Sequence, residues 1–210
     1  MIQTIVSSIA VFVATSIDYL LILTILFSQV RTKKGITHIV GGQYLGTAIL
    51  VAVSLLAAYV LHFIPEEWMI GFLGLVPIIL GIRVAVKGDD DDGEDEAGEL
   101  AEKMEARKSS RLFWTITLIT IASGGDNLGV YIPYFASLSV GAILVALLVF
   151  AVATTVLCYL GYKLSTIRLI SNTLEKYEKI IVPIVYIALG IYIMIESGTF
   201  GKLLQLIGWN

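Results

Sequence analysis

Six apolar segments, separated by short polar stretches, dominate the pattern of hydrophobic and polar positions along the chain. They cover residues 2–29, 37–63, 68–86, 112–136, 139–163 and 180–198. Crossing the hydrocarbon core takes about 20 apolar residues, and backbone groups in lipid must be satisfied internally. The runs do not alternate as barrel strands do. The pattern therefore predicts an all-α membrane protein with six transmembrane helices.

The first segment begins at the N-terminus, where a signal peptide is the competing interpretation. "MIQTIVSSIAVFVATS" lacks a basic beginning, and its apolar run continues to Phe27. A cleaved apolar region is shorter, about 7–15 residues. We therefore expect a retained span. The composition agrees, because 57% of the residues are hydrophobic, against about 45–50% in a soluble domain.

Lysine and arginine fall almost entirely on one side of the predicted membrane. Thirteen of the fourteen lie in or beside the loops after the first, third and fifth segments, whereas "HFIPEEW" and "ASLSV" contain none: Arg31, Lys33, Lys34, Arg83, Lys87, Lys103, Arg107, Lys108, Arg111, Lys163, Arg168, Lys176 and Lys179. Basic loops stay in the cytoplasm. This predicts a multi-pass protein of the cytoplasmic membrane with both termini outside.

The longest polar stretch, residues 88–110, contains ten of the seventeen acids. It divides the chain into a first three-helix unit (1–87), an acidic cytoplasmic loop (88–110) and a second three-helix unit (111–210). The loop cannot be an EF-hand, because aligning Gly93 with the loop glycine puts Gly88 where an aspartate ligand is needed. It is either a solvated linker or an antenna that attracts divalent cations. No basic patch indicates nucleic-acid binding.

The two three-helix units resemble each other. "ATSIDYLLILTILF" (14–27) aligns without a gap on "ASGGDNLGVYIPYF" (122–135), which matches Asp18 with Asp126. An odd number of spans per unit forces opposite insertion and so predicts an inverted-topology repeat. Both aspartates then lie near the bilayer midplane, where the symmetry should bring them together.

An ionised carboxylate at the bilayer centre costs about 2.5–3.5 kcal/mol. No Lys, Arg or His is placed deeply enough to pair with Asp18 or Asp126, so the two acids must share protons or hold a cation. The alternative is a protonated structural pair. Thr15, Ser123 and Asn127 add oxygen atoms close to the same turns.

Glycines and a proline make the fourth segment a poor regular helix: Gly124, Gly125, Gly129 and Pro133. A broken helix frees backbone carbonyls that can bind cations. Close packing through glycine is the competing explanation.

Two further polar residues have open roles. Gln43 is either a ligand from a third helix or half of a helix–helix hydrogen bond. Cys158 would favour a soft metal as a thiolate, but a lone buried cysteine also serves as a small hydrophobe. His38 and His62 look interfacial, and Glu196 looks like a rim residue.

Several motifs together resemble the CadD-type cadmium-resistance transporters of Gram-positive bacteria, in the lysine-exporter (LysE) superfamily. They are "ATSIDYLLIL", "GQYLGTA", the acidic loop, "DNLGVYIPYF" and "EKYEKIIVPIVYIALGIYI". The resemblance implies efflux of Cd²⁺, with other divalent cations as further substrates, and a metal site at Asp18 and Asp126. The family pattern often has a second acid after the span-four aspartate, where this chain has Asn127. This departure leaves two midplane carboxylates and bears on selectivity and proton stoichiometry.

The partners that follow are a divalent cation, protons and the lipid bilayer, with no other cofactor and no enzymatic activity. No nucleotide-binding motif is present, so proton antiport is the simplest driver. Exporters of Mn²⁺ or Zn²⁺, or of an amino acid or other small metabolite, are the rival functions, with a thiol oxidoreductase or a metal sensor as remoter ones. Glycine-rich faces can pack within one protomer or between protomers. The oligomeric state therefore stays open, with a homo-oligomer as one alternative.

Overall fold

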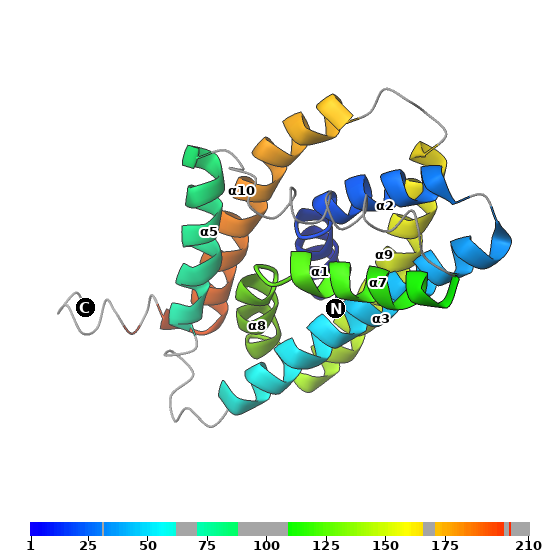
Figure 1. Cartoon of the computed structure of the whole chain (residues 1–210). Helices are drawn as coiled ribbons and strands as arrows, with labels where there is room; N and C mark the ends of the chain where they lie inside the picture. Colours follow the sequence, from blue (N-terminus) through cyan, green and yellow to red (C-terminus); the bar gives the residue numbers. More distant parts are fainter. Residues whose placement is uncertain (31, 62–70, 88–108, 166–170, 200–201, 203–210) are drawn as a thin grey trace.

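The computed structural model describes residues 1–30, 32–61, 71–87, 109–165, 171–199 and 202. These residues form helices and no strand (Figure 1). In chain order the helices are α1 (Ile2–Ala14), α2 (Ile17–Gln29), α3 (Lys33–Leu61), the 3₁₀ turn η1 (Gly71–Gly74), α5 (Leu75–Lys87), α7 (Ser109–Ser123), α8 (Leu128–Ala136), α9 (Val140–Leu164) and α10 (Ser171–Glu196). Every apolar segment predicted to be helical carries helix. The acidic loop, apart from its last two residues, lies outside the described residues.

Length and hydropathy mark α3 and α9 as helices able to cross a membrane individually. The bent pair α1 and α2 passes the same test when taken together, which makes three. Three shorter apolar helices accompany them: Gly71–Arg83, Leu112–Ser123 and Val182–Glu196. The chain is thus an all-helical membrane protein, and the number of six crossings stays a prediction.

The first predicted span is not one helix, and here the sequence interpretation was wrong. α1 and α2 meet at Thr15 and Ser16 with a bend of 57°. The Thr15 hydroxyl donates to the carbonyls of Val11 and Phe12 at 2.9 and 3.2 Å. Such local side-chain bonds compete with the helical ladder and bend it. Neither Gly nor Pro marks this break.

The fourth predicted span is also broken, as its glycines suggested. α7 ends at Ser123 and α8 begins at Leu128, with turns between them. Gly124 has no room for a side chain, because a Cβ there would lie 2.3 Å from Leu50 and 2.8 Å from the Thr120 carbonyl. Pro133 lies within α8 and does not form the break. The two breaks occupy the positions that the repeat alignment matches.

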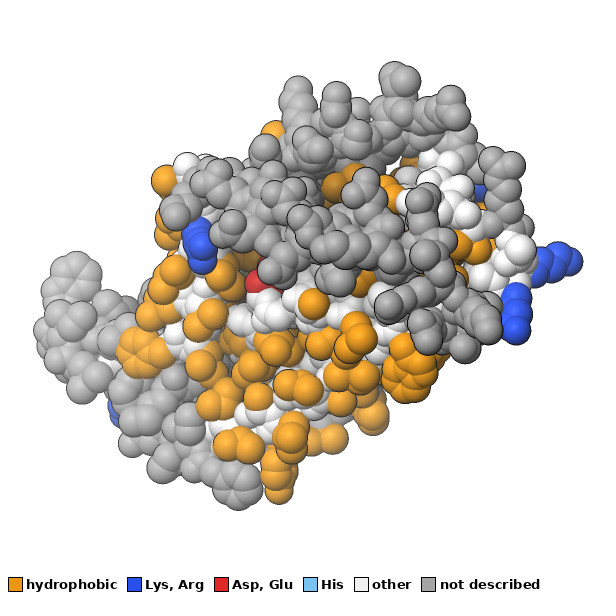
Figure 2. Space-filling view, viewed as in Figure 1, with side chains coloured by type: hydrophobic (Ala, Val, Ile, Leu, Met, Phe, Trp, Pro, Cys, Tyr) orange, Lys and Arg blue, Asp and Glu red, His pale blue; other side chains and the backbone are white. Residues whose placement is uncertain are grey.

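The polarity of the molecule suits a lipid solvent. Large apolar side chains on the outer face of α9 recur every four residues: Val140, Leu144, Leu148, Val152 and Val156 are all exposed. The interior, by contrast, contains polar side chains such as Ser8, Ser54 and Thr154. Figure 2 shows broad apolar areas on one face, with lysine and arginine side chains near its margins. Apolar side chains in this arrangement face hydrocarbon, while polar ones find partners inside.

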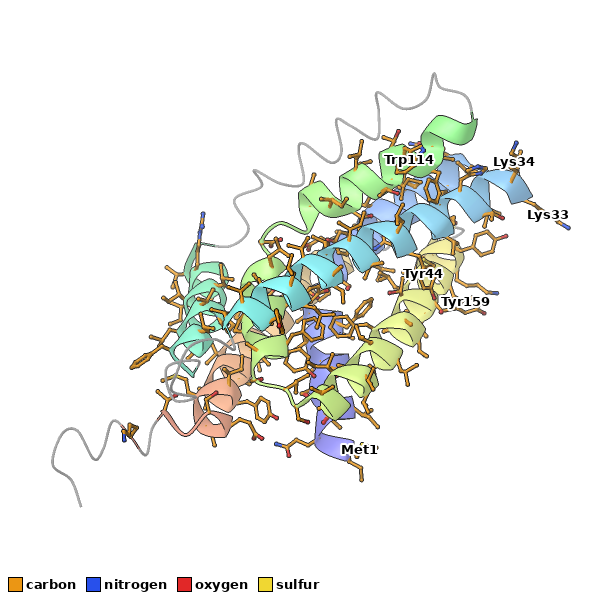
Figure 3. The ribbon with its side chains drawn as sticks, turned by 90° about the horizontal axis from the view of Figure 1, so that it is seen from below. Met1, Lys33, Lys34, Tyr44, Trp114 and Tyr159 are labelled. Carbon is orange, nitrogen blue, oxygen red and sulfur yellow. The ribbon has the colours of Figure 1, made fainter. Side chains whose placement is uncertain are left out.

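Helix packing follows a regular pattern. α3 packs along α7 and α8, α9 packs along α1 and α2, and α5 packs along α10. Glycines bring the first of these pairs close: a Cβ at Gly42 would lie 2.7 Å from the Phe113 carbonyl, and one at Gly46 2.5 Å from Thr120. Tyr44 joins α3 to α9 by donating to the Ala151 carbonyl at 2.9 Å (Figure 3). These contacts position the two breaks inside the bundle.

Candidate metal site at the two helix breaks

Asp18 and Asp126 occupy equivalent positions beside the two breaks. Asp18 lies in the first turn of α2 and is half-buried. Asp126 directly precedes Asn127, the N-cap of α8, and is exposed. Each carboxylate therefore lies at the N-terminal end of a helix that begins inside the molecule. The helix dipole is positive there and stabilises negative charge, which compensates part of the cost of an acid at membrane depth.

Two tyrosines lie near both carboxylates. Tyr186 of α10 interacts electrostatically with both Asp18 and Asp126, and Tyr19 of α2 interacts with the same two acids. Tyr131 of α8 interacts with Asp126. The three tyrosines are buried. The two acids thus share one group of phenol side chains.

Asn127 joins the breaks. Its Nδ2 group donates to the backbone carbonyl of Thr15 at 3.0 Å and to the hydroxyl of Tyr19 at 3.2 Å. Its backbone N–H donates to Oδ1 of Asp126 at 2.9 Å. One buried residue therefore bonds to the ends of both broken spans and holds the Asp126 carboxylate. Its amide nitrogen is committed to these hydrogen bonds, so the predicted role of Asn127 as a metal ligand would fall to the amide oxygen.

Thr15 lies at the first break and Ser123 at the second, and both are close to an aspartate as the sequence predicted. The buried Thr15 hydroxyl is 2.9 Å from the hydroxyl of Tyr131, in addition to its bonds within α1. Ser123 is the last residue of α7 and is half-buried. Both lie close to an aspartate along the chain, and their roles as metal ligands stay predictions.

The carbonyls freed by the breaks have side-chain donors. Asn127 bonds to the Thr15 carbonyl, and the Tyr19 hydroxyl donates to the Thr120 carbonyl at 3.0 Å. The sequence predicts that freed carbonyls are available to a cation. At these two positions they instead bind one helix to another, so a cation that used them would have to displace Asn127 or Tyr19.

Gln43 of α3 is buried and bridges two helices. Its Oε1 accepts a hydrogen bond from the Thr120 hydroxyl of α7 at 2.9 Å, and its Nε2 donates to Thr47 at 3.4 Å. This is the helix–helix hydrogen bond that the sequence left open as one of two roles. Since Tyr19 bonds to the carbonyl of Thr120, Gln43 is connected to the site through one residue.

Cys158 is a buried free thiol within the apolar core. One turn further along α9, a Cβ at Gly161 would meet Leu23 at 2.9 Å, so this part of α9 packs against the second half of α2. These surroundings match those of a small hydrophobe, the simpler of the two predicted roles.

The remaining polar candidates lie at the margins. The His38 ring bonds to the Lys34 carbonyl of its own helix, and Glu196 is exposed at the end of α10. His62 lies outside the described residues.

Tyr19, Tyr131 and Tyr186 are site residues that the sequence interpretation missed. A phenol hydroxyl buried at membrane depth requires a hydrogen-bond partner. Tyr19 also follows Asp18 directly, which was the available signal.

The two breaks carry one carboxylate each, and hydroxyl and amide oxygen atoms lie close to them along the chain. In the part of the chain that the structure describes, no group of three or more His, Cys, Asp and Glu side chains clusters as a metal centre. Two carboxylates balance one divalent cation, and hydroxyl and amide oxygens are ligands that such ions accept. The arrangement suits reversible binding of a cargo ion.

An all-helical bundle with an apolar exterior and acids at internal helix breaks defines a class, the helical membrane transporters. The particular family follows from comparison of the sequence with known ones. The description of the cadmium resistance transporter family matches residues 12–206, and the chain belongs to that family. No curated protein and no solved structure matches the chain significantly.

Proposed function

We propose that the chain is a secondary active exporter of divalent metal cations, Cd²⁺ among them, and that the cation binds between Asp18 and Asp126. The observation that carries this proposal is the equivalence of the two acids. Each lies at the N-terminal end of a half-helix where a span is broken, and Asn127, which directly follows Asp126, donates a hydrogen bond to the Thr15 carbonyl at the other break. Membership of the cadmium resistance transporter family supplies the cargo class.

The architecture we propose is six crossings arranged as two inverted three-helix repeats, with both termini outside. The breaks in α1–α2 and α7–α8 support it, because they fall at matched positions. The packing supports it too: exchanging the two repeats converts the contact of α3 with α7 and α8 into that of α9 with α1 and α2. The same exchange turns α5 into α10 and α10 into α5, so their mutual contact is unchanged.

Export requires an energy source. Moving one charge through 100 mV costs about 2.3 kcal/mol, so expelling a divalent cation against such a potential costs about 4.6 kcal/mol before any concentration gradient. We infer proton antiport, in which the two aspartates hold either the metal or protons. The site then stays near neutral in both half-cycles, which lowers the cost of crossing the membrane.

Mn²⁺ or Zn²⁺ is the second candidate cargo, and the ligand chemistry favours it. Carboxylate, hydroxyl and amide oxygens suit harder cations than Cd²⁺. The soft ligand that would select cadmium, Cys158, lies in the apolar core. The further oxygen ligands that we propose for the cation come from Thr15, Ser123 and Asn127. Gln43 would have to exchange its hydrogen bond with Thr120 for the cation.

Substitution of the acids tests the proposal. Asp18→Asn and Asp126→Asn should each abolish cadmium resistance and metal efflux from cells, while the protein remains folded and inserted. Glu196→Gln, which removes an exposed acid at the end of α10, is the matched control and should retain efflux. Normal efflux by either aspartate variant would refute the site.

Inside-out vesicles test cargo and coupling. Uptake of Cd²⁺, Mn²⁺ and Zn²⁺ should accelerate when the lumen is made acidic. A rate of metal uptake that does not change with the pH gradient would refute proton antiport. Amino-acid uptake without metal binding would instead identify a metabolite exporter.

A further inference from the structure

A compact group of rings lies on one side of the two aspartates. This aromatic layer consists of Phe12 of α1, Tyr131, Tyr134 and Phe135 of α8, and Phe150 of α9. The exposed fraction of each of the five side chains is 3% or less. The ring centroids of Phe150 lie 5.3 Å from both Phe12 and Tyr131 and 5.7 Å from Phe135. These are the separations of packed aromatic pairs, so the layer fills the interior at this level.

Two sets of hydrogen bonds, which we call clasps, join α1 to α8 across the layer. The Tyr134 hydroxyl lies 3.0 Å from the Ser7 hydroxyl and 2.7 Å from that of Ser8. The Tyr131 hydroxyl lies 2.9 Å from that of Thr15. Both clasps join the first half of one broken span to the second half of the other. Separating α1 from α8 would therefore break the hydrogen bonds of both clasps and separate the rings of the aromatic layer.

The layer lies on the Met1 side of the acids. Tyr131 lies in the first turn of α8, five residues after Asp126. Phe12 lies in α1, six residues before Asp18 and on the other side of the bend at Thr15 and Ser16. Asp126 is exposed and Asp18 half-buried, whereas the layer is closed. The packed rings thus separate the two acids from the Met1 end of the bundle.

We propose that the aromatic layer is the outer gate of the transport path and that this structure is the state open to the cytoplasm. The proposal rests on the proposed function. A cation that binds from the cytoplasm between Asp18 and Asp126 meets packed rings on the other side. Its release outward requires α1 and α8 to separate at the two clasps, which fits rocking of one repeat against the other.

Accessibility of a single cysteine tests this gate without requiring transport. Gly125 is exposed beside Asp126, and a Cβ there would meet only the Ala122 carbonyl, at an ordinary 3.6 Å. The probe is therefore Gly125→Cys in full-length protein carrying Cys158→Ala. A membrane-impermeant thiol reagent is applied to right-side-out and to inside-out vesicles. Labelling should be fast from the cytoplasmic face and slow from outside.

Variants of the layer should change the external rate alone. Phe12→Ala removes a ring, and labelling from outside should rise about tenfold, which corresponds to about 1.4 kcal/mol in the gate equilibrium. Tyr131→Phe keeps the ring and loses one clasp, so it should give a smaller rise and keep the proposal testable if Phe12→Ala does not fold. Trp114→Ala, which removes an aromatic side chain that is 61% exposed on α7 (Figure 3), should change nothing.

Equal labelling from both faces in the unaltered layer would overturn the gate, as would an external rate that neither layer variant changes. Normal efflux by Asp18→Asn would instead refute the metal site and leave the labelling result standing.

Discussion

The side-chain amide of Asn127 donates a hydrogen bond to the backbone carbonyl of Thr15 at 3.0 Å. This hydrogen bond joins the two helix breaks directly. Thr15 ends the first half of one broken span, and Asn127 begins the second half of the other. The same amide bonds to Tyr19. Asn127, where the resemblance implies a second acid, is therefore a structural connection between the two broken spans. A carboxylate there could accept from Tyr19 but could not donate to Thr15 while ionised.

Asn127→Leu should destabilise the protein by about 1–3 kcal/mol, because it leaves the Thr15 carbonyl buried without its donor. The measurement is thermal unfolding of purified protein in detergent, followed by loss of the monodisperse peak. Ser123→Ala is the control, since it removes a half-buried hydroxyl at the other edge of the break, and it should change stability little. Equal stability of Asn127→Leu and the unaltered protein would show that the contact does not hold the breaks together.

Gln43→Leu separates the two roles left open for this residue. Its hydrogen bond to Thr120 stabilises the pairing of α3 with α7, and interhelical bonds of this kind in membranes contribute about 0.6–2 kcal/mol. If the bond is purely structural, the variant should lose that stability and keep its apparent affinity for the metal in vesicle uptake. A metal affinity that falls tenfold or more, with stability unchanged, would make Gln43 a ligand instead.

The sequence predicted much of the fold because a chain in lipid must form long apolar helices. Every described helix overlaps one of the six apolar segments, and Gly124 and Gly125 indicated one of the two breaks. The bend of the first span escaped prediction, because Thr15 is an ordinary helical residue until its hydroxyl bonds back to Val11 and Phe12. Its cause is therefore a hydrogen bond, which no pattern of apolar positions records.

The two acids of the candidate site could be predicted from the sequence, but the side chains that surround them could not. Asp18 and Asp126 were conspicuous, since ionisable residues are rare at membrane depth. The placement of Tyr19 and Tyr186 near them depends on how α2 and α10 rotate within the bundle. Rotation is set by packing between helices far apart in the sequence, and one sequence taken alone does not reveal it.

Gly46→Ala tests the close packing of α3 on α7. A Cβ at this position would lie 2.5 Å from Cβ and 2.7 Å from Cγ2 of Thr120, so the helices must move apart. Overpacking of this kind costs about 1–3 kcal/mol, and the melting temperature should fall. Gly141→Ala is the matched control, because a Cβ there would meet nothing within 4 Å. Equal melting of the two variants would mean that the α3–α7 contact is looser than the structure has it.

Cys158→Ala tests whether cadmium is selected by a thiolate. The side chain is 4% exposed and belongs to the apolar core, where a charged thiolate would be costly. We therefore expect the variant to keep its resistance to Cd²⁺ and the ratio of Cd²⁺ to Mn²⁺ uptake, with a small loss of stability from the missing sulfur atom. Cys158→Val, which refills that volume, should behave in the same way in transport. A fall in Cd²⁺ uptake with Mn²⁺ uptake preserved in both variants would place the sulfur in the cation path, and α9 would then have to rotate during the cycle to bring it there.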